Sequence, residues 1–461
     1  MRRLGAAAAA VLAAWAGAAR AECPPGAGDC QALLETGAPG GRVDFVIVGD
    51  GYTAAERDAF YADAAAVAES LRTASTYASY APVFNVWALF VPSPESGADD
   101  PMTGADVDTA FDATFGYQGI DYLIGISTGG VLGEINDRFP EFDVPMCLVN
   151  APKYGGSGGT IAVVSSHPDA VRIMEHELGH SFAGLADEYE VPYPGYPPGD
   201  SEPNVAALEN LDPLKWSPWV TPGTPIPTPI ASATSLYEPI GAYEGARYLT
   251  EDIFRPAPNC RMRELGREFC PVCAEAMVLG FAELRALIDE TSPPDGTAIP
   301  AVGPSPLSVT VPELADLDFV WSVDGVITSW DGSVLPLDPA VLQLADGPHT
   351  VSVTVRDETA LVRSDPEGLL EETATWTVVV DSSLPPVGGA GGGGEGGAPP
   401  DEDPPAEDDA DEDGCSCGSA GGPASSTGAL AGLVALVGLF NARGRLRRRS
   451  AGSRSCPRRS R

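Results

Sequence analysis

The first 290 residues alternate short apolar runs with helical patterns. A continuous apolar run at Val43–Val48 ends in Gly49-Asp50-Gly51, which predicts a buried strand closed by a turn. Thr53-Ala54-Ala55-Glu56 has the form of a capping box, and the alanine-rich segment that follows to about Arg72 predicts a helix. Similar apolar runs predict strands at 84–91, 122–126, 146–149 and 161–164. This alternation indicates an α/β domain.

A further amphipathic helix is predicted directly after the run at 161–164. Pro168 suits its first turn, and Val171, Met174 and Leu178 recur at helical spacing up to a stop at Gly184. We expect the preceding strand to border a cleft, where an extended peptide can add to it by β-augmentation. Frequent proline predicts an irregular loop at 191–229, and the segment 274–288 predicts a closing helix.

From about residue 291 the periodicity changes from helical to alternating. Phe319–Val323, His349–Val355 and Ala374–Val380 alternate in period two and are rich in β-branched and aromatic residues. Asp-Gly and Asp-Pro turns separate these runs. We therefore expect an α/β domain over 22–290, followed by a small Ig-like, all-β sandwich over 291–382.

The two ends of the chain carry targeting patterns. Residues 1–21 have arginines, an Ala/Leu-rich run and an A-x-A site, which together predict a secretory signal peptide. Residues 383–414 form a Gly-rich and acidic linker, predicted to be disordered. Residues 415–461 hold Cys415 and Cys417, an apolar segment at 428–440 and an arginine-rich tail, and this segment resembles the MYXO-CTERM sorting signal. We expect export, with the protein at the cell surface or outer envelope, or secreted after C-terminal processing.

Charge narrows the range of partners. The formal net charge is −38, and removing the three arginines of the leader and the nine of the tail would make it −50. Nucleic acid is an unsuitable partner for such an acidic chain, because phosphate binding needs a basic surface. The 13-residue apolar segment is short for a span of about 20 residues, and we expect membrane contact only through the C-terminal segment.

The most informative motif of the chain is His176-Glu177-Leu178-Gly179-His180, because it contains two of the four histidines. On a helix, residues four apart share one face, so both imidazoles can reach one metal ion. A Zn²⁺ held in this way keeps a position for water and lowers its pKa, and Glu177 can take that water's proton. The pattern therefore predicts a zinc hydrolase.

Two histidines do not complete a zinc site, so a third ligand is required. Beyond Gly184 the chain reaches Asp187, seven residues after His180, and then Glu188. Either carboxylate can serve as the third ligand, and Glu275 on the later predicted helix is a further alternative.

Cysteine positions agree with an oxidising compartment. We expect disulfides between Cys23 and Cys30, and between Cys260 and either Cys270 or Cys273. The pair Cys270-Pro271-Val272-Cys273 also has the form of half a zinc site or of a redox motif, although no second pair is near it in the sequence. Cys147 lies in an apolar run and is predicted to be a buried free thiol.

The stretch His176–Tyr189 resembles the signature of the IgA-peptidase family of zinc metallopeptidases. It departs from the metzincin pattern by one residue, because Ala183 stands where metzincins have a turning glycine. The resemblance extends over about residues 40–285. Its other segments are Asp50–Thr53, Asn85-Val86, Glu202–Val205, Lys215-Trp216, Gly241–Gly245, Asn259–Met262 and Phe269–Cys273.

The resemblance implies a metzincin-like α/β zincin that cleaves protein or peptide substrates with Zn²⁺ as cofactor. His176, His180 and Asp187 would then be the metal ligands, with Glu188 as the alternate, and Glu177 the general base. Met262 would form the methionine turn beneath the metal. Groups that stabilise the oxyanion would come from Tyr189, Tyr243 and Arg261. The rival interpretation is a surface binding protein or adhesin with a structural or inactive metal site.

Overall fold

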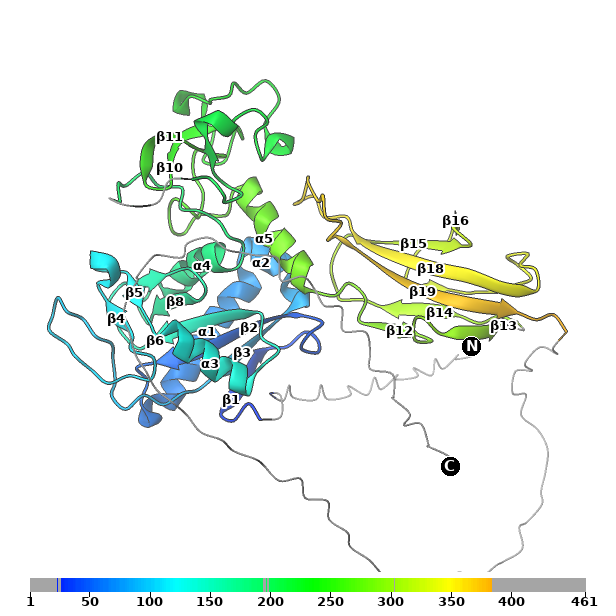
Figure 1. Cartoon of the computed structure of the whole chain (residues 1–461), viewed down its shortest axis with the longest axis horizontal. Coiled ribbons are helices and arrows are strands. Elements are labelled where there is room, and N and C mark those ends of the chain that lie inside the picture. Colours follow the sequence, from blue (N-terminus) through cyan, green and yellow to red (C-terminus); the bar gives the residue numbers. More distant parts are fainter. Residues whose placement is uncertain (1–22, 24–25, 194–195, 197–198, 302, 384–461) are drawn as a thin grey trace, which may run out of the picture. The chain divides into compact units, whose positions relative to one another are not determined.

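The computed structural model describes residue 23 and residues 26–193, 196, 199–301 and 303–383 (Figure 1). All of these residues belong to one compact unit, residues 1–390. The predicted signal peptide, nearly all of the linker and the sorting tail lie outside the described residues. The described chain is a mixed α/β structure with several sheets. None of its helices is both long and apolar enough to cross a membrane.

A six-stranded sheet forms the centre of the N-terminal part. Its four inner strands are parallel, while the two outer strands run antiparallel to their neighbours. Parallel strands covered on both faces are typical of α/β folds, and every residue of β2 and β6 is buried. In sheet order the strands are β1 Cys30–Leu34, β3 Phe84–Leu89, β2 Val43–Asp50, β6 Val144–Val149, β8 Ala162–Ser165 and β7 Gly156–Ser157.

Helices cover both faces of this sheet. In β2, Phe45 and Ile47 join one hydrophobic cluster while Val46 and Val48 join another, as the alternation of side chains along a strand requires. The first cluster holds most of the buried apolar residues of α1, α4 and α5, and the second holds those of α3. The helices are α1 Arg57–Thr73, α2 Ser75–Ser79, α3 Thr128–Arg138, α4 Ala170–Ser181 and α5 Pro271–Leu284.

The segment between α4 and α5 has little regular structure, in agreement with the proline-rich pattern at 191–229. Its main element is a three-stranded sheet ordered β10, β11, β9. The strands there are β9 Ala206–Ala207, β10 Tyr243–Ala246 and β11 Leu249–Arg255, and β4 Thr114–Phe115 pairs with β5 Ile124–Gly125 earlier in the chain. The 3-10 helices are η1 Ala54–Glu56, η2 Ala81–Val83, η3 Tyr117–Gly119, η4 Leu208–Asn210, η5 Ser217–Trp219 and η6 Ile230–Ser232.

The residues after α5 form two further sheets. Buried residues of both sheets join in one hydrophobic cluster, in which the rings of Trp321 and Trp376 stack with centroids 5.7 Å apart. One sheet has the order β12 Glu290–Ser292, β14 Leu307–Thr310, β17 Val334–Leu335. The other has the order β13 Ala298–Ala301, β19 Glu371–Val380, β18 Gly347–Asp357, β15 Leu317–Val323, β16 Val326–Ile327.

Several predicted elements need correction. The strand at 161–164 is not a free edge, because β7 pairs with β8 and Gly156 forms a further bridge to Leu123. A peptide therefore cannot add to β8 as expected. The strand predicted at 122–126 shortens to Ile124–Gly125, and α3 was not predicted, because its three glycines weaken a helical pattern. Helix α5 begins earlier than expected, since Pro271 occupies its first position.

Phe281 of α5 is a central contact of the first cluster. Its buried ring lies 5.7 Å from the ring of Phe84 on β3 and 4.8 Å from that of Phe182, which directly follows α4. The ring also stacks on Tyr80 at 5.4 Å. Phe281 thus connects α5, the sheet and the end of the helix that carries the histidines.

We expect Phe281→Ala to lower the free energy of unfolding by about 3–5 kcal/mol, because it leaves a cavity between these elements. Val379→Ala, at an exposed position of β19, should change it by less than about 0.5 kcal/mol. Chemical denaturation of the purified proteins measures both values. Equal losses for the two variants would contradict the central position of Phe281.

Candidate metal centre

Helix α4 positions both histidines of the motif. His176 and His180 stand one turn apart with ring centroids 4.9 Å apart, and His176 is buried. The helix packs against β8, β7 and α1, with Met174 and Leu178 in the core. The remaining face of α4 therefore presents the two imidazoles on one side, as the spacing predicts.

Backbone carbonyls determine which nitrogen of each ring is available to a metal. The Nδ1 atom of His176 lies 3.0 Å from the carbonyl oxygen of Arg261, and Nδ1 of His180 lies 2.7 Å from that of Leu185. A carbonyl oxygen only accepts hydrogen bonds, so each Nδ1 carries the proton and donates it. In its neutral form each imidazole then presents the lone pair of Nε2, the arrangement found in histidines that bind metals, and a proton on Nε2 takes the place of the metal when none is bound.

A turn after α4 brings Asp187 to these two nitrogens. Gly184 has a φ of 62°, a left-handed conformation that favours glycine, and its N–H donates to the carbonyl of His180 at 3.1 Å. Oδ1 of Asp187 lies 3.1 Å from Nε2 of His176 and 3.3 Å from Nε2 of His180. The three donor atoms lie within 4.8 Å of one another.

These separations fit one tetrahedral metal ion. Ligands about 2.0–2.1 Å from a tetrahedral zinc lie about 3.3 Å from each other. The observed distances of 3.1 and 3.3 Å from Oδ1 to the two nitrogens are close to that value. Two imidazoles and one carboxylate are also a donor set that zinc accepts, with a fourth position left for water.

Charge at the group favours a cation. Burial opposes the ionisation of Asp187, but attraction to His180 and a hydrogen bond from His176 outweigh burial and hold its pKa far below the usual range. Burial also opposes protonation of His180, yet Asp187 raises the pKa of this imidazole to about 9. The carboxylate therefore stays ionised and attracts positive charge to the space between the three donors, where a proton and a divalent metal ion compete.

Glu177 lies beside this group, next to a glycine-rich segment. A Cβ atom at Gly156 would lie 3.3 Å from Oε1 of Glu177, and one at Gly158 would lie 2.9 Å from Oε2. Burial raises the pKa of Glu177 above its ordinary value. Tyr122 and Tyr154, whose rings lie 6.1 Å apart, are both more than a third exposed. Burial raises the pKa of each phenol; the charges of Asp187 and then Glu177 raise that of Tyr122 further, and the charge of Glu177 raises that of Tyr154. A carboxylate with raised pKa thus lies close to two exposed aromatic side chains.

Two residues that the sequence analysis missed hold Asp187 in place. Asn204 is buried and bonds to both backbone groups of Ala186, at 2.8 and 2.9 Å. The hydroxyl of Tyr248 donates to Oδ2 of Asp187. Tyr248 has a φ of 64°, strained for a non-glycine residue, and such strain concentrates at functional sites. Asn204 stands in a segment of the family resemblance, whereas no sequence pattern pointed to Tyr248.

Met262 lies beneath the histidine helix. A Cβ atom at Gly179 would lie 2.5 Å from Sδ of Met262, so a side chain at that position has no room. The N–H of Glu188 also donates to the carbonyl oxygen of Met262 at 2.8 Å. The segment around Met262 therefore touches both the helix and the segment after Asp187, and the methionine turn stays a prediction.

Other predicted residues are engaged elsewhere. The guanidinium of Arg261 pairs with Glu175 and donates to the carbonyl of Arg267 at 2.8 Å, so only its backbone carbonyl serves the site. The hydroxyl of Tyr243 donates to the carbonyl of Pro239 at 2.8 Å. Neither side chain is placed to contact a substrate at the histidines. The hydroxyl of Tyr189 lies 3.4 Å from that of Tyr248, which puts Tyr189 next to the metal-ligand group.

The alternative third ligands also lie elsewhere. Glu188 accepts hydrogen bonds from Asn204 at 3.0 Å and from the thiol of Cys273 at 3.2 Å. Glu275 accepts from the indole of Trp219 at 2.8 Å and from two backbone N–H groups. Among the three carboxylates that the sequence left open, only Asp187 reaches the histidines.

The cysteines differ in part from expectation. Cys23 and Cys30 form a disulfide, and Cys147 is a buried free thiol. The expected bridge from Cys260 to Cys270 or Cys273 is wrong, because all three remain separate, buried thiols. The reason is geometric: the three sulfur atoms converge on one point together with the carboxylate of Glu188, rather than pairing.

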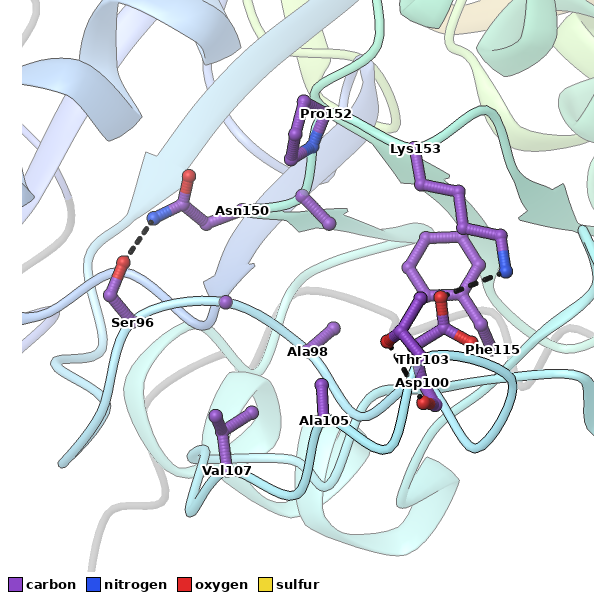
Figure 2. A pocket seen from close by; sticks show the side chains of 12 residues that line it. Ser96, Ala98, Asp100, Thr103, Ala105, Val107, Phe115, Asn150, Pro152 and Lys153 are labelled. Atoms are coloured by element: carbon purple, nitrogen blue, oxygen red, sulfur yellow. Dashed lines mark hydrogen bonds and ion pairs between the residues drawn. The ribbon is translucent and has the colours of Figure 1, made fainter.

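A cavity of about 280 Å³ lies between the loop at 96–107 and the residues that follow β6 (Figure 2). Asn150 bonds to Ser96 across it, and Lys153 pairs with Asp100 at 3.0 Å. Neither the histidines nor Asp187 line this cavity, and its one lysine is already paired. We therefore assign the chemistry to the histidine group and not to this cavity.

One comparison with known proteins covers the part of the chain that holds this site. Residues 31–236 match the family model described as IgA Peptidase M64, and this segment includes Glu177 and the three donor residues. No curated protein matches the chain significantly. Among solved structures, the X-ray structure of the endo-beta-1,4-mannanase from Thermotoga petrophila aligns at 10% identity and a TM-score of 0.14, covering 74% of this chain and 65% of that one. The chain thus spans just under two thirds of that structure, and so low a TM-score carries no argument.

We expect Gly179→Ala to destabilise the protein by about 1–3 kcal/mol, because the added methyl overlaps Met262. Gly133→Ala in α3 is the matched control, since its Cβ would have no neighbour within 4 Å. Alanine is the better helix former by up to about 1 kcal/mol, so the control should stabilise. Thermal unfolding gives both signs. Stabilisation by both changes would place Met262 away from the helix.

We expect Tyr248→Phe to weaken metal binding about 10- to 100-fold, because its hydroxyl orients the carboxylate of Asp187. Tyr243→Phe removes a hydroxyl that bonds to Pro239 instead and should leave the metal affinity unchanged. Competition with a chromogenic zinc chelator measures both affinities. The same affinity in Tyr248→Phe and the unaltered protein would remove Tyr248 from the support of the site.

Proposed function

The chain belongs to the IgA peptidase M64 family through residues 31–236, and we propose that it is an exported zinc-dependent endopeptidase. The observation that carries the proposal is the convergence of His176, His180 and Asp187 beside Glu177. A site with only a structural role has no need for a carboxylate at this position. In this proposal residues 22–290 form a metzincin-like catalytic domain, and residues 291–382 form an accessory β-sandwich.

The donor set fits zinc. His176, His180 and Asp187 would hold the ion through Nε2, Nε2 and Oδ1, with both imidazoles oriented by their carbonyl partners. When bound, zinc supplies Lewis acidity at a peptide carbonyl and lowers the pKa of a coordinated water. Tyr248 and Asn204 hold the ligand segment and fix the position of its carboxylate.

Glu177 performs the proton transfer in this mechanism. Its carboxylate takes the proton of the attacking water and passes it to the leaving amine. Burial raises the pKa of Glu177, which brings it nearer to the operating pH and strengthens it as a base. Gly156 and Gly158 have no side chains, so their backbone can lie close to the carboxylate of Glu177.

Substrate contacts come from the aromatic side chains near the centre. Tyr122 and Tyr154 lie near Glu177, and Tyr189 lies on the side of Asp187. We assign Tyr189 to the oxyanion of the tetrahedral intermediate, which a phenol can stabilise by a hydrogen bond. The proposed substrates are extended segments of proteins or peptides. We do not extend immunoglobulin specificity to this chain, because the family name comes from one member.

The ends of the chain support export. The predicted signal peptide at 1–21 directs secretion, and the C-terminal pattern at 415–461 directs sorting at the envelope. The Gly-rich and acidic linker would then separate the enzyme from the surface. Strong negative charge favours solubility of the mature protein and repels the phosphates of nucleic acid.

We expect Glu177→Gln to keep its zinc and to lose about 10²- to 10⁴-fold in kcat, because it removes only the proton acceptor. Asp187→Ala should lose the zinc ion at the histidines and the activity together. Glu209→Gln, at an exposed position on η4, is the matched carboxylate control and should retain both. Zinc content and cleavage of unfolded protein are measured side by side. Equal cleavage by Glu177→Gln and the unaltered protein would refute the proposal, and a zinc-loaded protein that cuts no peptide would favour the rival binding protein.

A further inference from the structure

A second group of metal-binding residues lies outside the site described above. Three cysteines and one glutamate bring their donor atoms within 4.8 Å of one another, and all four residues are buried: Glu188, Cys260, Cys270 and Cys273. The thiol of Cys273 lies 3.2 Å from Oε1 of Glu188, and the N–H of Cys270 donates to the sulfur of Cys260 at 3.2 Å. From this geometry we propose that the chain binds a second, structural zinc ion through these four residues.

The carboxylate of Glu188 points to a ligand that completes this group. Its side chain is fully buried, and although Oε1 has two partners, Oε2 has none among the described residues. Burying a carboxylate oxygen without a partner costs free energy, so such an atom requires an explanation. A cation at the centre of the group would satisfy Oε2 directly.

The donors suit zinc in number and type. Sulfur ligands about 2.3 Å from a tetrahedral zinc lie about 3.8 Å apart, within the spread of this group. Three thiolates and one carboxylate fill four positions and leave none for water, as in a closed structural site. Thiolates select soft metals, and the hard carboxylate in the set favours zinc over Cu(I).

Local structure favours thiolates at this point. Cys270 is the N-cap of α5 and Cys273 lies in its first turn, where the positive end of the helix dipole stabilises negative charge. The guanidinium of Arg255 is buried and is attracted to Glu188, and Arg263 donates to the backbone carbonyl of Glu188 at 2.7 Å. These cations offset the negative charge of a zinc ion with four anionic ligands.

A disulfide explains the group less well. A bridge between any two of the three sulfurs leaves the third thiol unpaired and leaves Oε2 of Glu188 without a partner. Three thiols and one carboxylate supply the four ligands of one metal ion, whereas a disulfide would use only two of the three thiols. The sequence pair Cys270 and Cys273 is thus half of a zinc site, whose other half is Cys260 and Glu188.

The second ion would support the first site. Glu188 directly follows Asp187, and Cys260 directly precedes Arg261, whose carbonyl oxygen accepts the hydrogen bond from His176. Holding Glu188 and Cys260 on one ion fixes both segments against the start of α5. Loss of this ion should therefore weaken zinc binding at the histidines about 10- to 100-fold, as removal of supporting groups does at other metal sites.

The test counts zinc ions in the full purified chain by elemental analysis. We expect two ions per chain in the unaltered protein, and one in both the His176→Ala/His180→Ala and the Cys270→Ser/Cys273→Ser variants at saturating zinc. Cys147→Ser, at a buried thiol outside the group, should keep two ions. A single ion in the unaltered protein, lost completely in the histidine variant, would overturn the proposal.

A second measurement needs no variant. The unaltered protein loaded with Co²⁺ should show intense near-ultraviolet absorption from thiolate-to-cobalt charge transfer, which the histidine and aspartate donors cannot produce. Absence of this absorption, or a disulfide among the three cysteines found by mass spectrometry, would overturn the second site. Neither result depends on cleavage, so failure of this proposal and failure of the peptidase proposal are distinguishable.

Discussion

The contact between Asp187 and the two imidazoles of α4 is the interaction on which the remainder of the site depends. It exists because the chain reverses at Gly184, whose left-handed backbone allows the segment after the helix to return along it. An ionised carboxylate buried against two histidines is costly unless a cation satisfies it. The surrounding structure is arranged to keep these three donors in place.

Support for that contact comes from parts of the chain far apart in sequence. The carbonyl oxygens of Arg261 and Leu185 fix the two imidazoles, Asn204 holds the backbone before Asp187, and Tyr248 bonds to the carboxylate. Each of these groups acts on orientation rather than on charge. The histidine motif supplies the chemistry, while four residues between Leu185 and Arg261 supply the geometry that makes it usable.

Much of the fold could be predicted from the sequence, because its signals are local. The buried strand that begins at Val43 and the existence of the helix that carries the histidines follow from periodicity. The predicted ends of that helix are wrong, because it begins at Ala170 rather than at Pro168 and ends at Ser181 rather than at Gly184. The sequence did not predict α3 because its glycines lower the helix propensity of the segment. In the structure this helix is stabilised by packing against β2 and β6. The edge partner of β8 was missed because β7 is only two residues long, too short to show a pattern.

At the site, the sequence alone could not decide which of two adjacent carboxylates is the third ligand. Asp187 and Glu188 differ by one position, and the sequence left both open as the third ligand, whereas in the structure they serve two different donor groups. Cys260 and Glu188 are far from each other in sequence, so their meeting with Cys270 and Cys273 depends on tertiary structure. The expected disulfide failed for the same reason, because pairing rules do not include a carboxylate from a distant loop.

The central claim is that a zinc ion lies between His176, His180 and Asp187 beside Glu177. Anomalous X-ray diffraction from crystals of the protein, collected on both sides of the zinc absorption edge, tests it most directly. The account predicts an anomalous peak in contact with both Nε2 atoms and Oδ1 of Asp187. A protein that cleaves peptide bonds but shows no peak at this position would contradict it.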